Sequence, residues 1–475
     1  MARGHFHSSN ETVTLIKSNG QNGGSNYHDS ETEEGPLPLD HELDDPEKML
    51  LMEQGQPEKW KWSTFFRAAG PGIMVCLADT DGPCLITAAV SGQTYRYSLV
   101  LVQIILIPVL YAAQELTVRL GLATKDGITG LIRKRYGYFW AWFACTLHVL
   151  MCIQGQMSEF SSIQQLTTDV WDCESKIPVI LYFGVLVTSL FIGGWYFRAL
   201  EMFGLAAGSL QLVFVVIMFM TKFSFSELWN GLWTFHVNEV NYNELMAGNI
   251  GAVIMPWMLY YQQSALVQRK MKSSHVTYAR VDTAVGSLLA QTVMLAMVVA
   301  MGATAYLPDL GDEMAPTTFK TIVHAFAPFL GSEEISAVVV TVGMTGACLV
   351  ASIVLMITPV WSICEIMEWE KDLDTPFSEA PALFSLQFVG LFISLCSVLF
   401  SDVTLNPTFL VGVEIVNGLL ILPVATFLWL LASDPMVVPK QFRLTGLYKW
   451  TLFVTFAIVC AYCLYGSAAA IIDYY

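Results

Sequence analysis

The sequence predicts an all-α polytopic membrane protein. Of its 475 residues, 54% are apolar and only 13% are charged, and the mean hydropathy is +0.53. An ordinary soluble domain is about one-quarter charged, so a soluble protein of this composition could not cover its surface. From residue 63 onward, apolar runs alternate with short polar loops. Many of these runs reach the roughly 20 residues that a helix needs to cross a bilayer.

Eleven stretches are expected to cross the membrane, and two of them are interrupted. The first contains two carboxylates, a glycine and a proline, and the sixth contains a Met-Pro pair, whereas the others are predicted to be ordinary helices. The eleven lie at about 66–92, 96–122, 139–167, 178–195, 199–221, 246–268, 277–306, 334–366, 382–400, 407–432 and 446–472.

Two domains are expected, a disordered acidic cytosolic tail over 1–62 and a transmembrane domain over 63–475. The tail holds 12 acidic and 5 basic residues and is rich in Ser, Asn and Gly, so it cannot bury an apolar core. It is too short and featureless to be a signalling domain, which argues against a membrane sensor.

The distribution of Lys and Arg predicts the orientation. The loops on one side hold 14 basic residues and the opposite loops hold 4. Basic residues accumulate in cytosolic loops, so the N-terminus is predicted to be cytosolic and the C-terminus extracellular or lumenal. The argument applies equally to a plasma, endosomal or vacuolar membrane. The basic side consists of the loops 119–137, 195–200, 268–280, 367–381 and 432–449.

Charge and cysteine usage exclude several classes of protein. The net charge of −16 and the absence of a basic patch argue against nucleic-acid binding. Nine of the ten cysteines lie in apolar segments, and Cys173, in a polar loop, has no loop partner for a disulfide. No nucleotide, hydrolase or protease motif is visible, so neither an enzyme nor a bound cofactor is expected.

The first span is interrupted by Asp79-Thr80-Asp81-Gly82-Pro83. Pro83 removes a backbone donor and Gly82 loosens the backbone, so the helix should unwind here. A charge at the bilayer centre costs at least about 2.5 kcal/mol, and unwound backbone at that depth survives only where it lines a cavity or site. Freed carbonyls together with Asp79 and Asp81 would give the hard oxygen ligands that suit a cation.

The sixth span is interrupted at Met255-Pro256. Pro256 frees the carbonyl of Ala252, and Met255 offers a soft thioether at the same place. Two discontinuous helices, about 175 residues apart, are the signature of inverted repeats with a substrate site at the membrane midplane. The prediction is a 5+5 inverted repeat with unwound helices 1 and 6, the repeats covering about 66–221 and 246–432 before a final helix over 446–472.

Both breaks resemble those of the natural resistance-associated macrophage protein (NRAMP) family of divalent metal transporters. Asp79-Thr80-Asp81-Gly82 stands where the family has Asp-Pro-Gly-Asn, and Gly251-Ala252-Val253-Ile254-Met255-Pro256 is the closest local match. The resemblance runs from about Gly70 to Ala432. It implies the family's eleven- or twelve-helix inverted-repeat fold, and metal ligation by Asp79, the Ala252 carbonyl and the Met255 sulfur.

Several positions depart from the family pattern. Its histidines become Trp257 and either Gln262 or Gln263, and its third-span aspartate, linked to the proton route, aligns with Gln156. Glu159 matches the acid one turn later, so Gln156 and Glu159 are candidates for the exit path. Because Trp and Gln cannot carry protons, transport without proton coupling is expected.

The site residues point to two kinds of ion. Gly82 replaces the family's asparagine ligand, so a larger pocket with Asp79 and Asp81 should favour hydrated Mg²⁺, as in the NRAMP-related magnesium transporter branch. Met255 favours softer ions such as Mn²⁺, Fe²⁺ or Cd²⁺. We expect a facilitator of Mg²⁺, with Mn²⁺, acting by alternating access. A proton-coupled Mn²⁺/Fe²⁺ transporter is the alternative.

Other polar residues within the spans are weaker candidates. Glu414 and Asn417 lie three apart on one face of the tenth span, and with Trp257 and Gln262 they are candidates for lining the site. An amino-acid carrier of the same fold is a further alternative, although Asp79 and Asp81 would repel a carboxylate substrate. The expected partners are the divalent ion and the lipid bilayer, and the chain is expected to work as a monomer.

Charged residues near the span ends are expected to be structural. Glu115 and Arg119, four apart, predict an ion pair at the cytosolic end of the second span. Glu365 and Glu368 end the eighth span and are expected to be solvated charges.

Overall fold

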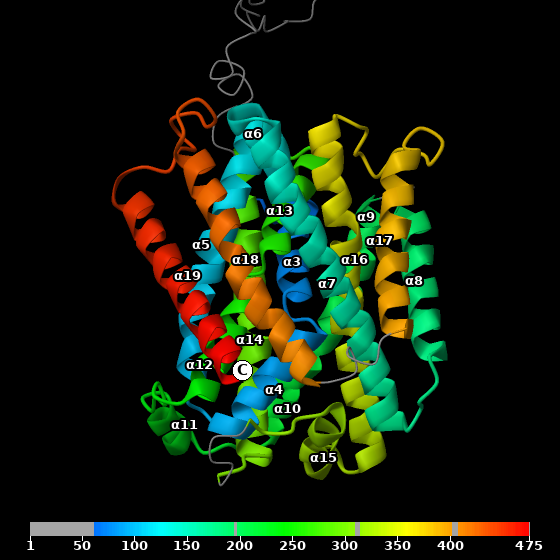
Figure 1. The fold of residues 1–475 in the computed structure, drawn as a ribbon, viewed down its shortest axis with the longest axis vertical. Helices are drawn as coiled ribbons and strands as arrows, with labels where there is room; N and C mark the ends of the chain where they lie inside the picture. The colour runs from blue at the N-terminus through cyan, green and yellow to red at the C-terminus, as the bar shows by residue number, and fades with distance from the viewer. Residues whose placement is uncertain (1–60, 194–196, 309–313, 401–406, 475) are drawn as a thin grey trace, which may run out of the picture. The chain divides into compact units, whose positions relative to one another are not determined.

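A computed structural model describes residues 61–193, 197–308, 314–400 and 407–474, all within one unit, Pro46–Tyr475. Every regular element in these ranges is a helix, which confirms the predicted all-α class (Figure 1). The predicted tail lies outside the described residues except at its last two positions, where α2 (Trp62–Ala68) begins.

Helices occupy all eleven predicted spans. By length and composition, seven helices qualify as membrane spans, and the bent pair α3–α4 counts as an eighth. The other three spans fall short because α7 carries many polar side chains, α8 has 17 residues and the sixth span is split into two short halves. The helices are α3 (Pro71–Ala78) with α4 (Gly82–Tyr95), α5 (Val100–Thr124), α7 (Tyr138–Trp171), α8 (Ile177–Gly193), α9 (Phe197–Ser209) with η2 (Leu210–Leu212) and α10 (Val213–Met220), α12 (Val240–Val253) with α13 (Pro256–Gln268), α14 (Val276–Thr304), α16 (Glu333–Met367), α17 (Pro381–Phe400), α18 (Pro407–Ser433) and α19 (Gly446–Tyr474).

Four short elements lie in segments that hydropathy leaves as loops. They are α6 (Ile128–Tyr136), α11 (Phe225–Gly231), η3 (Ser273–His275) and α15 (Phe319–Leu330). The start of α15 has a local cause, because Thr318 and Thr321 form a reciprocal capping box. Such elements are too short to appear in a search for 20-residue apolar runs.

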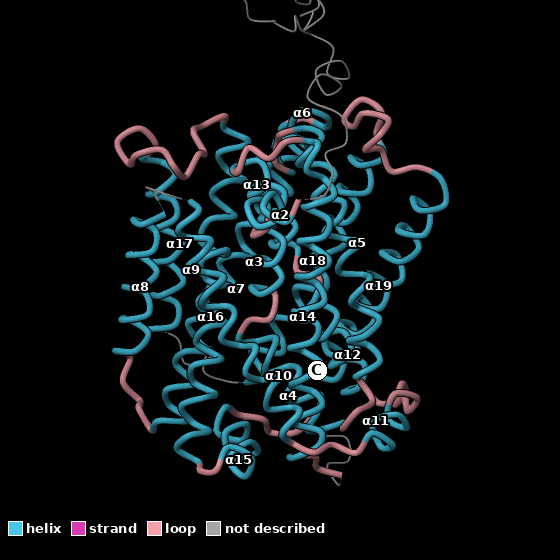
Figure 2. The backbone as a smooth tube through the Cα atoms, turned by 180° about the vertical axis from the view of Figure 1, so that it is seen from behind, coloured by secondary structure: helices cyan, strands magenta, loops and turns pink. Residues whose placement is uncertain are grey.

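The structure confirms that the first span is broken, and Figure 2 shows the chain leaving the helix between α3 and α4. The two halves meet at an angle of 56°. Pro83 lies in the first turn of α4, where its missing donor costs nothing, and Asp81 caps that helix.

The sixth span is broken in the same manner. Ile254 (φ −120°, ψ 67°) and Met255 (φ −77°, ψ 129°) leave helical geometry, and Pro256 starts α13. The extended conformation of Met255 is what a residue before proline prefers.

The two broken helices lie inside a wall of longer helices (Figure 1). α3 packs against α9, α13, α14 and α16, whereas α4 packs against α12, α14 and α18. α12 and α18 approach closely at Gly251, where an added Cβ would lie 1.9 Å from the carbonyl oxygen of Glu414. This packing brings a carboxyl-bearing turn of α18 to the level of both breaks.

Candidate metal centre

Asp79 and Asp81 place two carboxyl groups inside the first break. Asp79 ends α3, where its N–H donates to the carbonyl of Val75, and its side chain is buried. Neither Asp79 carboxylate oxygen has a hydrogen-bond partner among the residues that the structure describes. Asp81 accepts a hydrogen bond of 2.9 Å from the backbone N–H of Cys84. A buried carboxylate without partners is costly, so this arrangement suits a cationic ligand.

Cys84 connects the two breaks. Its thiol donates to the carbonyl oxygen of Ala252 across 3.3 Å. This is the carbonyl that Pro256 was expected to free, so the structure places a thiol donor on it. Met255 is fully buried at the same break. The two breaks therefore meet at a sulfur atom that the sequence motifs did not single out.

Glu414 brings a third carboxyl group, from α18. A carboxylate oxygen of Asp81, the sulfur of Cys84 and a carboxylate oxygen of Glu414 all lie within 4.8 Å of one another. Asn417, less than a turn further on, donates to Glu414 Oε2 at 3.2 Å, whereas Glu414 Oε1 has no partner in the described part of the chain. Oxygen and sulfur atoms this close together can share one cation.

Glu159 of α7 adds a fourth buried carboxyl group, next to Asp81. Asp79, Asp81, Glu159 and Glu414 are each at most 3% exposed. Within the described residues, no basic side chain is among the charged neighbours of these four groups. Buried charges are normally paired or bind a metal, so the cluster has the sign and burial that a divalent cation requires.

Gly82 does not enlarge the pocket, and that prediction is wrong. A Cβ at this position would lie 2.6 Å from Ser162 Oγ and 2.9 Å from Cys348 Sγ. Side chains from α7 and α16 therefore fill the volume in which the family's asparagine would stand. Sequence position alone could not show this, because both neighbours are far away in the chain.

Gln211 stabilises the unwound segment, and no sequence signal beyond a glutamine in an apolar span indicated it. Its Nε2 donates to the carbonyl of Leu77 at 2.8 Å, and its Oε1 accepts from Thr80 Oγ1 at 2.5 Å. Gln211 lies in η2, the tightened turn of the fifth span. It satisfies a carbonyl that the end of α3 leaves without a helical partner.

The remaining candidates have varied surroundings. Trp257 is buried in α13 just after the break. Gln262 donates to Thr283 Oγ1 at 2.6 Å and accepts from Thr117 Oγ1 at 3.3 Å, so it links α13 to α14 and α5. Gln156 donates to Ser352 Oγ at 2.8 Å, which ties α7 to α16. Both glutamine side chains are therefore engaged in contacts between helices.

Ionic contacts close the predicted cytosolic end of α3. The backbone N–H groups of Gly70 and Gly72 donate to the Asp282 carboxylate at 3.1 and 2.7 Å. Arg198 and Arg269 both pair with the buried Glu201, and each donates to the carbonyl of Ala69. These contacts hold the start of the first span against α9, α13 and α14.

Two predictions about the charges at this end had different outcomes. The Glu115–Arg119 ion pair is confirmed, at 2.8 Å. The prediction that Glu365 is solvated is wrong, because its side chain is buried and accepts hydrogen bonds from Thr129 and Ser264. Glu365 therefore joins α16 to α6 and α13.

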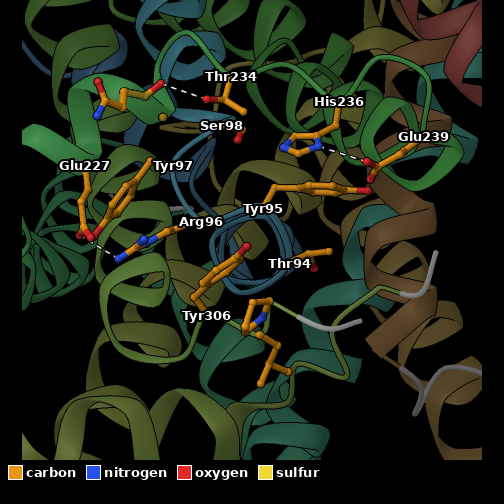
Figure 3. Close-up of a pocket in the computed structure, with 14 residues that line it drawn as sticks. Thr94, Tyr95, Arg96, Tyr97, Ser98, Glu227, Thr234, His236, Glu239 and Tyr306 are labelled. Carbon is orange, nitrogen blue, oxygen red and sulfur yellow. Dashed lines mark hydrogen bonds and ion pairs between the residues drawn. The ribbon is translucent and has the colours of Figure 1, made fainter. Parts of the chain in front are cut away.

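A cavity of about 530 Å³ opens at the opposite end (Figure 3). Tyr95, Arg96 and Tyr306 line it, and Arg96 forms a 2.8 Å ion pair with Glu227. Glu239, a second acid of this wall, contacts His236 Nδ1 at 3.1 Å. Both acids of this wall are therefore already paired.

These features define a membrane protein of the inverted-repeat transporter fold with acidic groups at its helix breaks. The chain belongs to the NRAMP family, since the family model described as natural resistance-associated macrophage protein-like matches residues 72–468. The resemblance seen at the two breaks is therefore confirmed, and so is the inverted-repeat fold.

Relatives and solved structures agree with this assignment. The chain is 26% identical over 263 residues to the divalent metal cation transporter MntH of Chromohalobacter salexigens, covering 53% of this chain and 59% of the relative. It is 23% identical over 276 residues to the metal transporter Nramp6 of Arabidopsis thaliana, covering 54% and 50%. The chain thus matches between 50% and 59% of the length of these two relatives. A manganese transporter mutant of Eremococcus coleocola shares the fold, with a TM-score of 0.70 at 15% identity over 85% of this chain and 86% of that one.

Proposed function

We propose that this protein is a secondary transporter that moves divalent metal cations across a membrane by alternating access. The observation that carries the proposal is the group of buried carboxyl groups at the two helix breaks, which has no basic neighbour among the described residues. Two relatives described above are named as metal transporters, which agrees with a cation as the substrate.

The same geometry argues against an amino-acid carrier. Carriers with broken helices hold a substrate carboxylate at the N-terminus of a half-helix. Here the side chain of Asp81 already occupies the N-terminus of α4, and Asp79 lies two residues away. A carboxylate substrate would meet two acids where it needs free N–H donors.

Among divalent ions, the site favours transition metals over Mg²⁺. Ser162 and Cys348 fill the space at Gly82, so the larger pocket that would suit hydrated Mg²⁺ is missing. The Cys84 thiol among the carboxyl groups adds a soft ligand atom. Preference for Mg²⁺ remains the competing prediction.

We further propose that transport is not coupled to protons. Trp257 and either Gln262 or Gln263 stand where the family has histidines. The Gln262 side chain is hydrogen-bonded to two threonine hydroxyls, and that of Gln263 to the carbonyl of Asp126. The membrane potential can drive entry instead, since it contributes about 2.3 kcal/mol per charge per 100 mV, and a divalent ion gains twice that.

Uptake into proteoliposomes of the purified full chain tests these statements together. Mn²⁺, Mg²⁺ and Ca²⁺ would be compared with and without a pH gradient while the lumenal pH is recorded. We expect Mn²⁺ entry that exceeds Mg²⁺ entry, responds to the membrane potential and leaves the pH unchanged. Entry of none of the ions would refute the transport proposal. Acidification that accompanies Mn²⁺ would refute the uncoupled mechanism alone.

A further inference from the structure

We propose that Cys84 is itself a metal ligand, so that the ion is held by a mixed set of sulfur and carboxylate oxygen from Cys84, Asp81 and Glu414. The inference rests on the proposed function and names the ligand set of that same site. It concerns a side chain outside the Asp79, Ala252 and Met255 set that the family resemblance implies.

The spacing of the three ligand atoms is close to that of a bound metal. They lie within 4.8 Å of one another. Around a tetrahedral ion with bonds of 2.0–2.3 Å, ligand atoms are about 3.6 Å apart. Side-chain movements of about 1 Å would therefore complete the site.

A second observation favours a cation at this cluster. Both oxygens of Asp79 and Glu414 Oε1 are buried without a hydrogen-bond partner in the described part of the chain. Asp79 and Glu414 are also close enough to repel each other and Asp81. A cation at the three-atom cluster would satisfy Glu414 directly and offset the repulsion.

The local fold explains why Cys84 can serve this purpose. Asp81 is the N-cap of α4 and Cys84 is three residues further on, so both side chains lie on the same first turn. The Cys84 thiol donates to Ala252 O. When the sulfur binds a metal, its proton would pass to the nearby Asp79 carboxylate and return to the sulfur when the ion leaves, so that no proton crosses the membrane. The hydrogen bond to Ala252 is then lost, which leaves that carbonyl free to turn toward the ion.

The ligand set predicts which metal ions depend most on Cys84 for binding. Thiolate ligands favour Zn²⁺ and Cd²⁺, whereas carboxylate and water suffice for Mn²⁺ and Mg²⁺. Replacing Cys84 by serine should therefore weaken Cd²⁺ and Zn²⁺ binding by about 10- to 100-fold, and Mn²⁺ binding much less.

Cys348 offers a matched control. It is buried like Cys84, and its sulfur packs at Gly82 from α16, but it is not one of the three clustered ligand atoms. Cys348→Ser removes a sulfur of the same kind from the same neighbourhood.

The experiment is an equilibrium titration of the purified full chain with Co²⁺ and Cd²⁺, read by the near-ultraviolet charge-transfer absorption of a metal–thiolate bond. We expect the band in the natural protein and in Cys348→Ser, and its loss in Cys84→Ser together with the weaker Cd²⁺ affinity. Elution as a single species in size-exclusion chromatography verifies folding.

Two results would overturn the inference: Cd²⁺ binding to the natural protein without the band, or a band that persists in Cys84→Ser. In both, metal still binds, so the proposed function stands. Failure to bind any metal, together with no uptake, would refute both the inference about Cys84 and the proposed function. If Cys84→Ser does not fold, Cys84→Ala, which removes the sulfur without adding a hydroxyl group, is titrated in its place and must lack the band.

Discussion

At the residue scale, both carboxylate oxygens of Asp79 lack a hydrogen-bond partner in the described part of the chain, as do both oxygens of Glu159. We expect Asp79→Asn to reduce metal uptake by more than about tenfold, because the variant keeps the shape and removes the charge. The midpoint of thermal unfolding should not fall, since the change relieves repulsion from Asp81 and Glu414. Uptake in proteoliposomes and unfolding in detergent measure the two effects.

Asp172→Asn serves as the control, because the side chain of that aspartate is 87% exposed and its ion pair with Lys320 is long, at 3.9 Å. Its uptake should match that of the natural protein. Normal uptake by Asp79→Asn would show that the charge of Asp79 does not contribute to holding the ion.

At the scale of elements, the close approach of α12 and α18 determines where Glu414 lies. In Gly251→Ala the new methyl group would lie 1.9 Å from the Glu414 carbonyl oxygen and 2.9 Å from Gly418 N. Both are backbone atoms, so the helices must separate. We expect a loss of at least about 1–3 kcal/mol in the free energy of unfolding, and weaker Cd²⁺ binding.

Gly184→Ala in α8 is the matched helical control. An added Cβ there has nothing within 4 Å, so stability should stay constant or rise by up to about 1 kcal/mol. Equal stability of the two variants would contradict the close approach of α12 and α18.

Hydrogen bonds to Asp282 of α14 hold the start of α3 in place at the predicted cytosolic end. Asp282 accepts from two backbone N–H groups of α3, and hydrogen bonds to charged groups contribute about 1.5–3 kcal/mol each. Asp282→Asn should therefore raise the fraction of molecules in which the start of α3 has separated from α14 by more than about tenfold. The rate at which a permeant maleimide alkylates Cys76, fully buried on α3, reports this opening.

Asp374→Asn is the control that distinguishes a specific release of α3 from a general loss of stability. Asp374 also accepts from a backbone N–H, that of Phe197 at the start of α9, but it does not hold α3. In Asp374→Asn, the rate at which Cys76 is alkylated should equal that of the natural protein. An unchanged rate in Asp282→Asn would show that this contact does not restrain α3.

At the scale of the whole molecule, the bias in basic residues predicts which end faces the cytosol. Cys173 lies in the loop between α7 and α8, on the predicted outer side, and is partly exposed. A membrane-impermeant maleimide added to intact cells should label it, and Cys173→Ser should abolish that label. Labelling only after the membrane is permeabilised would reverse the predicted orientation.

Local patterns were sufficient for the helical framework. Hydropathy located each long helix because an apolar run must face lipid or protein throughout its length, whatever its neighbours are. Pro83 and Pro256 located both breaks, because a proline removes a donor from its own segment. Short elements such as α6 and α11 lacked such a signal.

The sequence by itself determined the fold class, the two breaks, the family and the acids of the first break, because each depends on residues adjacent in the chain. Only the tertiary structure decided what meets those acids. Cys84 reaches Ala252, Glu414 arrives on α18, and Ser162 fills the space at Gly82. These contacts join residues up to several hundred positions apart, and packing between helices determines them, so no local pattern records them.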